Sequence, residues 1–178
     1  MKKRFRRWHV LSNIIKEEGW TQGVELGVFA GSNLCYLLEH HPRLHMIGVD
    51  TWEPQPEKDN QYDLGGRSYL KAGLPGLYER LVRRIVEKEW QKRCVLLHMT
   101  TLEAARALNV KSDFVFIDAD HLEGAVRADI KAWYPLVRPG GMLLGHDTHF
   151  PGVRAAIDDL CPGWQQYNDK VWGVRIWL

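Results

Sequence analysis

The sequence Val24-Glu-Leu-Gly-Val-Phe-Ala-Gly-Ser32 joins an apolar strand to a helix through a turn that holds two glycines. Glycine lets a backbone turn tightly and approach a ligand closely. The amides that open the following helix, near Ser32, then point toward that ligand. This pattern predicts an open α/β fold with the turn at the ligand-binding edge of the sheet. The alternative interpretation is a strand–turn–helix connection that binds nothing.

The segments on both sides of this turn alternate between short apolar runs and amphipathic stretches. Such alternation is typical of a doubly wound, mostly parallel sheet with helices on both faces. We expect helices at 5–18, 32–40, 75–92, 102–108, 122–133 and from Pro151 onward. Strands are expected at 22–26, 45–50, 95–97, 114–117 and 142–144. A turn at Pro139-Gly-Gly141 is expected to precede the last of these strands. Residues 164–178 are predicted to form an antiparallel hairpin hinged at Asn168-Asp169.

The length of 178 residues predicts a single domain, 1–178, with an N-terminal helix inside residues 1–19. Residues 53–73 carry prolines, glycines and charges directly after a strand end, which predicts an active-site lid. The net charge of +2 argues neither for nor against a nucleic-acid partner. No apolar run reaches the roughly 18 residues that a membrane helix needs. Three scattered cysteines fit a reducing environment, so we expect a cytoplasmic protein.

The beginning of the chain is strongly basic, with cations at Lys2, Lys3, Arg4, Arg6 and Arg7. We interpret them as a solvated basic end before the first helix, with contact to an anionic partner as the alternative. The sequence predicts that the side chains of Trp8 and Trp20 are exposed to solvent. Together with the basic end, they are candidates for a homodimer interface.

Acidic residues follow the first two predicted strands. Glu25 lies two residues before Gly27 in the turn that ends at Gly31. A carboxylate there would repel a pyrophosphate but attract an ammonium or sulfonium cation, which favours S-adenosylmethionine over NAD. Asp50 ends the second strand, where an acid in this kind of fold accepts hydrogen bonds from both ribose hydroxyls. A helix cap or a surface acid is the alternative for Asp50.

Three further residues are expected to contribute to the cofactor site. Thr51 directly follows Asp50, and Met99 and Thr100 follow the third strand, where the adenine would rest. Thr100 or Thr101 fits equally well as the N-cap of the next helix.

The fourth and fifth strands end in a cluster of carboxylates and imidazoles: Asp118, Asp120, His121, His146, Asp147 and His149. Carboxylates repel one another unless a cation or a proton lies among them. Hard divalent cations such as Mg²⁺ prefer oxygen ligands, whereas histidine favours a transition metal. The alternative is that these acids are loop residues and helix caps.

As a set, these residues resemble the class I S-adenosylmethionine-dependent methyltransferases, and most closely their small O-methyltransferase branch. The resemblance spans residues 20–178, and its matching elements are Val24–Ser32, Gly48–Asp50, Phe114–His121, Asp129–Leu136 and Arg138–Asp147. It implies a seven-stranded sheet of order 3-2-1-4-5-7-6 with an antiparallel seventh strand, which agrees with the predicted terminal hairpin.

The resemblance also implies roles on the acceptor side. Asp118, His146 and Asp147 would hold a divalent cation, Mg²⁺ or another, and Asp118 would also border the cofactor. Asp120 or His121 would remove the proton from a hydroxyl of a small acceptor, such as a sugar or natural product. Nucleic acid is not the expected substrate, because the proline pair found after strand four in relatives that methylate nucleic-acid amino groups is missing here.

Two other functions fit the sequence less well. An NAD-linked oxidoreductase would need the G-x-G-x-x-G turn and usually a Tyr-x-x-x-Lys pair. Neither is present, since Tyr134 is followed four residues later by Arg138. A non-catalytic cofactor-binding domain would have no use for acids at so many strand ends.

Overall fold

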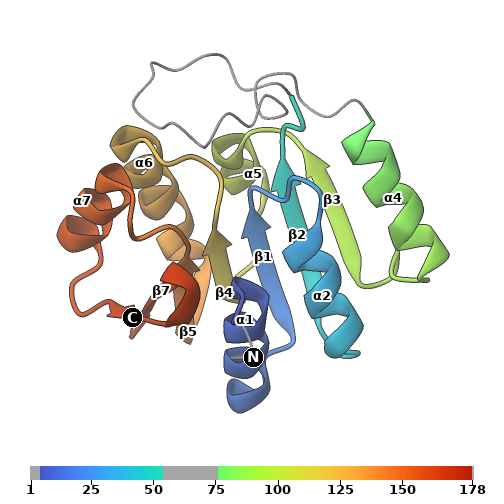
Figure 1. Ribbon diagram of the computed structural model, residues 1–178, viewed down its shortest axis with the longest axis horizontal. Coiled ribbons are helices and arrows are strands. Elements are labelled where there is room, and N and C mark those ends of the chain that lie inside the picture. The colour runs from blue at the N-terminus through green and yellow to red at the C-terminus, as the bar shows by residue number, and fades with distance from the viewer. Residues whose placement is uncertain (1–4, 54–75, 178) are drawn as a thin grey trace.

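The fold rests on one seven-stranded sheet, described by a computed structural model for residues 5–53 and 76–177 (Figure 1). The strands are β1 (Gln22–Leu26), β2 (His45–Asp50), β3 (Cys94–His98), β4 (Ser112–Ile117), β5 (Val137–Gly145), β6 (Gln165–Gln166) and β7 (Trp172–Arg175). Their order is β3-β2-β1-β4-β5-β7-β6. The first five strands pair in parallel, whereas β7 is antiparallel to β5 and β6. The predicted fold class and strand order are therefore confirmed.

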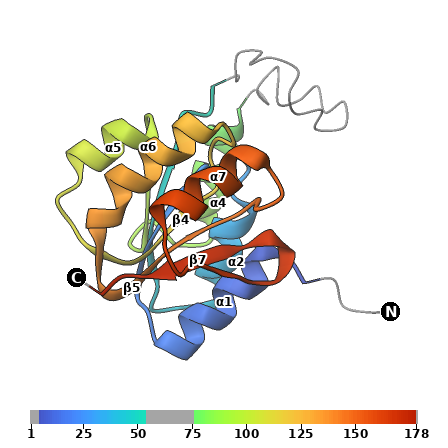
Figure 2. The same cartoon turned by 90° about the vertical axis from the view of Figure 1, so that its left-hand side faces the viewer.

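Helices cover both faces of this sheet, as Figure 2 shows. One face carries α1 (Arg7–Glu18), α2 (Ser32–His40) and α4 (Leu77–Glu87), and the other carries α5 (Thr101–Ala107), α6 (Glu123–Trp133) and α7 (Pro151–Leu160). Each face buries its own cluster of apolar side chains. Two short 3-10 helices, η1 (Tyr134–Leu136) and η2 (Asn168–Lys170), precede β5 and β7. This arrangement leaves the carboxyl ends of the parallel strands to form the site.

The sequence correctly predicts where α1 ends but places the end of α4 too late. Gly19 ends α1 in the left-handed conformation (φ 68°), as predicted. The helix expected at 75–92 ends earlier, at Glu87. The backbone then turns at Glu89 (φ 57°), and Trp90 is buried all the same. The apolar spacing at Trp90 thus reflected burial after the helix, not another helical turn.

The two predicted turns near the end of the chain have different outcomes. The glycines of Pro139–Gly141 do not precede β5 but lie inside it, where its register against β4 shifts. They therefore form an irregularity within a strand that is longer than predicted. The terminal hairpin is confirmed, because β6 and β7 pair in antiparallel fashion around η2.

Trp8 and Trp20 are partly buried within the chain itself and are not the exposed residues that the sequence predicted. Trp20 stacks on Phe114 with ring centroids 5.5 Å apart, and Trp8 lies 6.1 Å from the ring of Tyr36. Both rings therefore contribute to packing within the chain. A homodimer remains a prediction.

Two further sequence predictions concern an active-site lid and a membrane-spanning helix. The lid predicted at 53–73 lies, except for Glu53, outside the described residues. Among the helices of residues 5–53 and 76–177, none is long and apolar enough to cross a membrane.

Candidate functional site

The turn after β1 is packed tightly against the end of β4. Gly27 has a φ of 83°, and a Cβ there would lie 2.3 Å from the carbonyl oxygen of Asp118. Gly31 has a φ of 74°, and its Cβ would lie 2.5 Å from the side chain of Leu81. Only glycine fits such positions without displacement. Because Ser32 begins α2 directly afterwards, the helix N-terminus and the end of β4 meet at this turn.

Glu25 is a buried carboxyl beside this turn, with 1% of its surface exposed. Burial, reinforced by the negative charge of Asp118, raises the pKa of Glu25 to about 8. Its Oε2 atom has no hydrogen-bond partner among the described residues. A buried polar atom without a partner destabilises a fold, and a bound cation would favour the ionised form of this carboxyl. Glu25 therefore suits a cationic ligand group.

Asp50 fastens the turn after β1 to the end of β2. Its Oδ2 accepts the backbone N–H of Phe29 at 2.7 Å, and its Oδ1 accepts that of Trp52 at 2.8 Å. The indole Nε1 of Trp52 donates in turn to the carbonyl of Phe29 at 2.8 Å. A carboxylate offers about four lone-pair sites, so Asp50 retains acceptor capacity for a ribose diol. We call this set of hydrogen bonds the Asp50 latch.

An open cleft of about 570 Å³ lies beside the ends of β2 and β3. A cleft of this volume is typical of small-molecule sites. Its lining includes Thr51, Met99 and Thr100, the three residues that the sequence grouped together. The hydroxyl of Thr100 also accepts the backbone N–H of Glu103 at 3.2 Å, which confirms its predicted N-cap role. Thr100 therefore caps α5 from the wall of the cleft.

Three candidate metal ligands meet at the ends of β4 and β5. Asp118, His121 and Asp147 each place one donor atom within 4.8 Å of the others. The Nε2 atom of His121 lies 2.7 Å from Oδ2 of Asp147. Burial alone would raise the pKa of Asp147, but hydrogen bonds from His121 and His146 outweigh it and hold the pKa well below its usual range. Asp147 is thus ionised at neutral pH.

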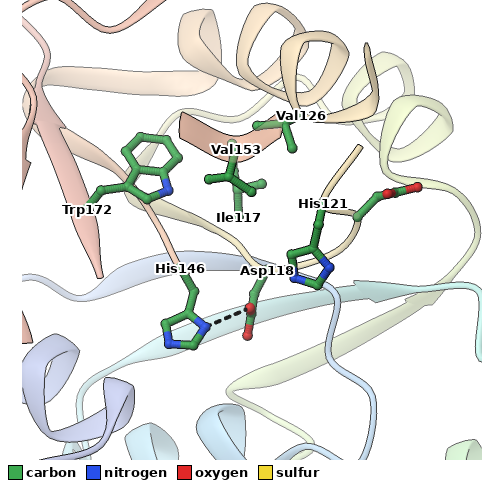
Figure 3. A pocket seen from close by; sticks show the side chains of 8 residues that line it. Ile117, Asp118, His121, Val126, His146, Val153 and Trp172 are labelled. Atoms are coloured by element: carbon green, nitrogen blue, oxygen red, sulfur yellow. Dashed lines mark ion pairs between the residues drawn. The ribbon is translucent and has the colours of Figure 1, made fainter. Parts of the chain in front are cut away.

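His146 lies between acceptors on both sides of its ring. Nε2 is 2.7 Å from the carbonyl of Asp169, and Nδ1 is 3.4 Å from Asp118, the pair drawn in Figure 3, and 3.0 Å from Asp147. Burial would lower the pKa of His146, but the two carboxylates outweigh it and raise the pKa to about 9. The donor atom of His121 lies within 4.8 Å of those of both carboxylates, which makes His121 a candidate ligand in addition to the predicted His146.

Asp120 and His121 line a small pocket of about 10 Å³, which has room for about one water molecule. Oδ1 of Asp120 accepts the backbone N–H of Leu122 at 2.9 Å, which fixes this carboxylate just before α6. Asp118 lines the same pocket and also contacts the turn at Gly27. The cofactor turn and this pocket therefore share a border. Apolar side chains complete the pocket: Ile117, Val126, Val153 and Trp172 (Figure 3).

Arg7 was predicted to be solvated with the other basic residues at the beginning of the chain, but in the structure it makes two polar contacts. Its Nε lies 3.1 Å from Oδ2 of Asp118, and its backbone N–H donates to Oδ2 of Asp169 at 2.7 Å. Arg7 shares one helical face with three buried apolar residues of α1, at spacings of three, four and seven: Val10, Leu11 and Ile14. That spacing is the signal that could have separated Arg7 from its basic neighbours. The sequence also assigned no role to Asn33 in α2 or to His98, which lines the cleft.

A seven-stranded sheet of this order, with its binding turn after β1, defines the fold of the class I S-adenosylmethionine-dependent methyltransferases. The profile of a family described as a methyltransferase domain matches residues 24–148. The chain belongs to this family, which confirms the predicted enzyme class. The match favours neither the NAD-linked oxidoreductase nor the non-catalytic domain. No curated protein matches the chain.

Solved structures share the fold at low sequence identity. A putative caffeoyl-CoA O-methyltransferase from Staphylococcus aureus is 11% identical, with a TM-score of 0.67 over 96% of this chain and 83% of its own. A calicheamicin methyltransferase is 17% identical, with a TM-score of 0.68 over 96% and 80%. The O-methyltransferase from Bacillus cereus, solved in complex with SAH, is 14% identical, with a TM-score of 0.66 over 95% and 80%.

Proposed function

We propose that this methyltransferase moves the methyl group of S-adenosylmethionine to a hydroxyl of a small polar molecule, such as a sugar or natural product. The close packing of Gly27 against Asp118 is the observation that carries the proposal, because it joins the cofactor turn to the acid-lined pocket. The names of two structural neighbours describe O-methyltransferases, which supports oxygen as the accepting atom.

In this proposal, the residues near each strand end bind one part of the cofactor or act on the acceptor. Glu25 binds the cationic amino-acid end of the cofactor, Asp50 accepts hydrogen bonds from the ribose, and the cleft at Met99 receives the adenine. When bound, S-adenosylmethionine supplies an electrophilic methyl group on a sulfonium. Asp120 accepts the proton of the acceptor hydroxyl. The border at Gly27 aligns the two substrates, and such alignment supplies much of the rate enhancement.

We further propose a divalent cation at Asp118, His121 and Asp147. Two carboxylates and one imidazole fit such an ion, and their donor atoms are already close together. When bound, the cation supplies a Lewis acid that lowers the pKa of the acceptor hydroxyl. Arg7 and His146 contribute the positive charges that the chain itself places around Asp118.

The Asp50→Ala substitution tests the cofactor assignment. We expect it to weaken binding of S-adenosylmethionine about 10- to 100-fold, because the ribose acceptor and the latch to Phe29 are both lost. Isothermal calorimetry measures the effect. Asp159→Ala, which removes an exposed carboxylate on α7, is the matched control. Unchanged affinity in Asp50→Ala would remove Asp50 from the cofactor site.

Chelation tests the metal assignment. Dialysis against EDTA should abolish most methyl transfer to a panel of hydroxyl acceptors, and Mg²⁺ or Mn²⁺ should restore it. Binding of S-adenosylhomocysteine, measured on the same samples, should persist, because it depends on the turn after β1. Full turnover after chelation would exclude the cation and leave Asp120 to act as general base without metal assistance.

A further inference from the structure

Three side chains beside the turn after β1 carry buried polar atoms that have no hydrogen-bond partner among residues 5–53 and 76–177. The atoms are Oε2 of Glu25, both amide atoms of Asn33 and Nε of Arg7, which lies 3.1 Å from Asp118 as an ion pair without hydrogen-bond geometry. Glu25 and Asn33 are each only 1% exposed. Burial dominates the pKa of Glu25, while the Arg7 charge and the Asn33 amide both oppose the rise. The three side chains flank one turn: Glu25 precedes it in β1, Asn33 follows it in α2, and Arg7 of α1 pairs with Asp118, whose carbonyl packs against Gly27.

Unpaired buried polar atoms are rare in folded proteins, and each usually has a specific explanation. These atoms match the two halves of one ligand group. The carboxylate of Glu25 accepts hydrogen bonds from a cation, whereas the guanidinium of Arg7 and the amide of Asn33 donate to an anion. An α-amino acid carries an ammonium and a carboxylate on the same carbon, so a single such group would pair all three residues.

The position of Arg7 is set by two contacts. Its backbone N–H donates to Asp169, which fixes the first turn of α1 against η2. Its guanidinium lies beside Asp118, and the side chain is 33% exposed. This exposure leaves the guanidinium room to turn from Asp118 toward a ligand in the turn after β1. α1 thus extends the site beyond the strand ends.

Building on the proposed function, we propose that Arg7 binds the α-carboxylate of the cofactor together with Asn33, while Glu25 receives the α-ammonium group. α1 is then part of the cofactor site, and Arg7 selects adenosyl compounds that carry an intact amino-acid end. In the ligand-free protein, Asp118 holds Arg7 near this position.

Calorimetry with two ligands and three proteins tests this inference. The ligands are S-adenosylhomocysteine and its decarboxylated analogue, which differ only in the carboxylate. Arg7→Met should weaken binding of S-adenosylhomocysteine about 10- to 100-fold, as expected for a charge-assisted hydrogen bond, and leave the analogue within about threefold of wild type. Arg6→Met removes the neighbouring guanidinium, which lies over Trp8, and should change neither affinity.

Arg7→Lys is a second variant that keeps the positive charge but loses the planar fork. It should weaken binding of S-adenosylhomocysteine about 3- to 10-fold and leave binding of the decarboxylated analogue unchanged. Equal losses for both ligands in both variants would mean that Arg7 acts only by placing α1, and this would overturn the inference. Unchanged affinities would overturn it too. If the wild-type protein bound neither ligand nor methylthioadenosine, the proposed function would fail first, and the inference with it.

Discussion

Asp147→Asn should lower kcat about 1000-fold and leave the affinity for S-adenosylhomocysteine within about threefold of wild type. The substitution keeps the size of the side chain but removes the charge that would hold the cation and pairs with His121. Asparagine also tolerates the left-handed backbone at this position, where φ is 64°. The loss therefore reports on chemistry at the ends of β4 and β5 and not on misfolding.

Two measurements make this result decisive. Methyl transfer to the panel of hydroxyl acceptors gives the change in kcat, and electron paramagnetic resonance with Mn²⁺ gives cation binding without any turnover. Asp158→Asn is the matched control, because that carboxylate is exposed on α7 and pairs with Arg154. An Asp147→Asn enzyme that kept both its activity and its Mn²⁺ affinity would remove this residue from the site.

Glu25→Gln should produce a protein that is more stable at pH 8 and binds its cofactor more weakly. The pKa of Glu25 in the folded protein, about 8, lies above the ordinary value of 4.5. The stability that this group contributes is therefore fully present below pH 4.5 and is lost as the pH rises to 8. The loss amounts to roughly 3–5 kcal/mol, and glutamine, which cannot ionise, should avoid most of it.

Urea denaturation of both proteins at pH 5 and pH 8 measures this difference. We expect the free energies of unfolding to be similar at pH 5 and to separate by about 2–4 kcal/mol at pH 8. Binding should show the complementary effect. A cation bound beside Glu25 favours its ionised form, so the wild-type affinity should rise between pH 6 and pH 8, whereas that of Glu25→Gln should follow pH less steeply. Parallel pH profiles for the two proteins would contradict this account.

The sequence was most informative about which residues meet at the carboxyl ends of the parallel strands. In a parallel sheet, residues after successive strands converge on one edge, so the meeting of Asp118 and Asp147 could be expected from their positions alone. Gly27 carried a second signal, because a glycine at that place implied a close approach of the backbone. The approach proved to be to the end of β4.

Side-chain partners across distant elements were harder to predict. Arg7 reaches Asp118 from a helix more than a hundred residues earlier, and although its spacing from the apolar residues of α1 places it on the inward face, nothing in that helix indicates its partner. His146 was predicted as a metal ligand from its residue type and its place after β5. Its ring also lies between the carbonyl of Asp169 and two carboxylates, and no pattern within the strand encodes these contacts.

The Asp50 latch has a consequence for the thermodynamics of ligand binding. Because Phe29 and Trp52 are already hydrogen-bonded to Asp50 and to each other, the conformational entropy of ordering this turn is lost during folding and not on association. A preorganised template of this kind favours rigid ligands that match its shape. Constrained adenosyl analogues should therefore gain more affinity here than flexible analogues with the same polar groups.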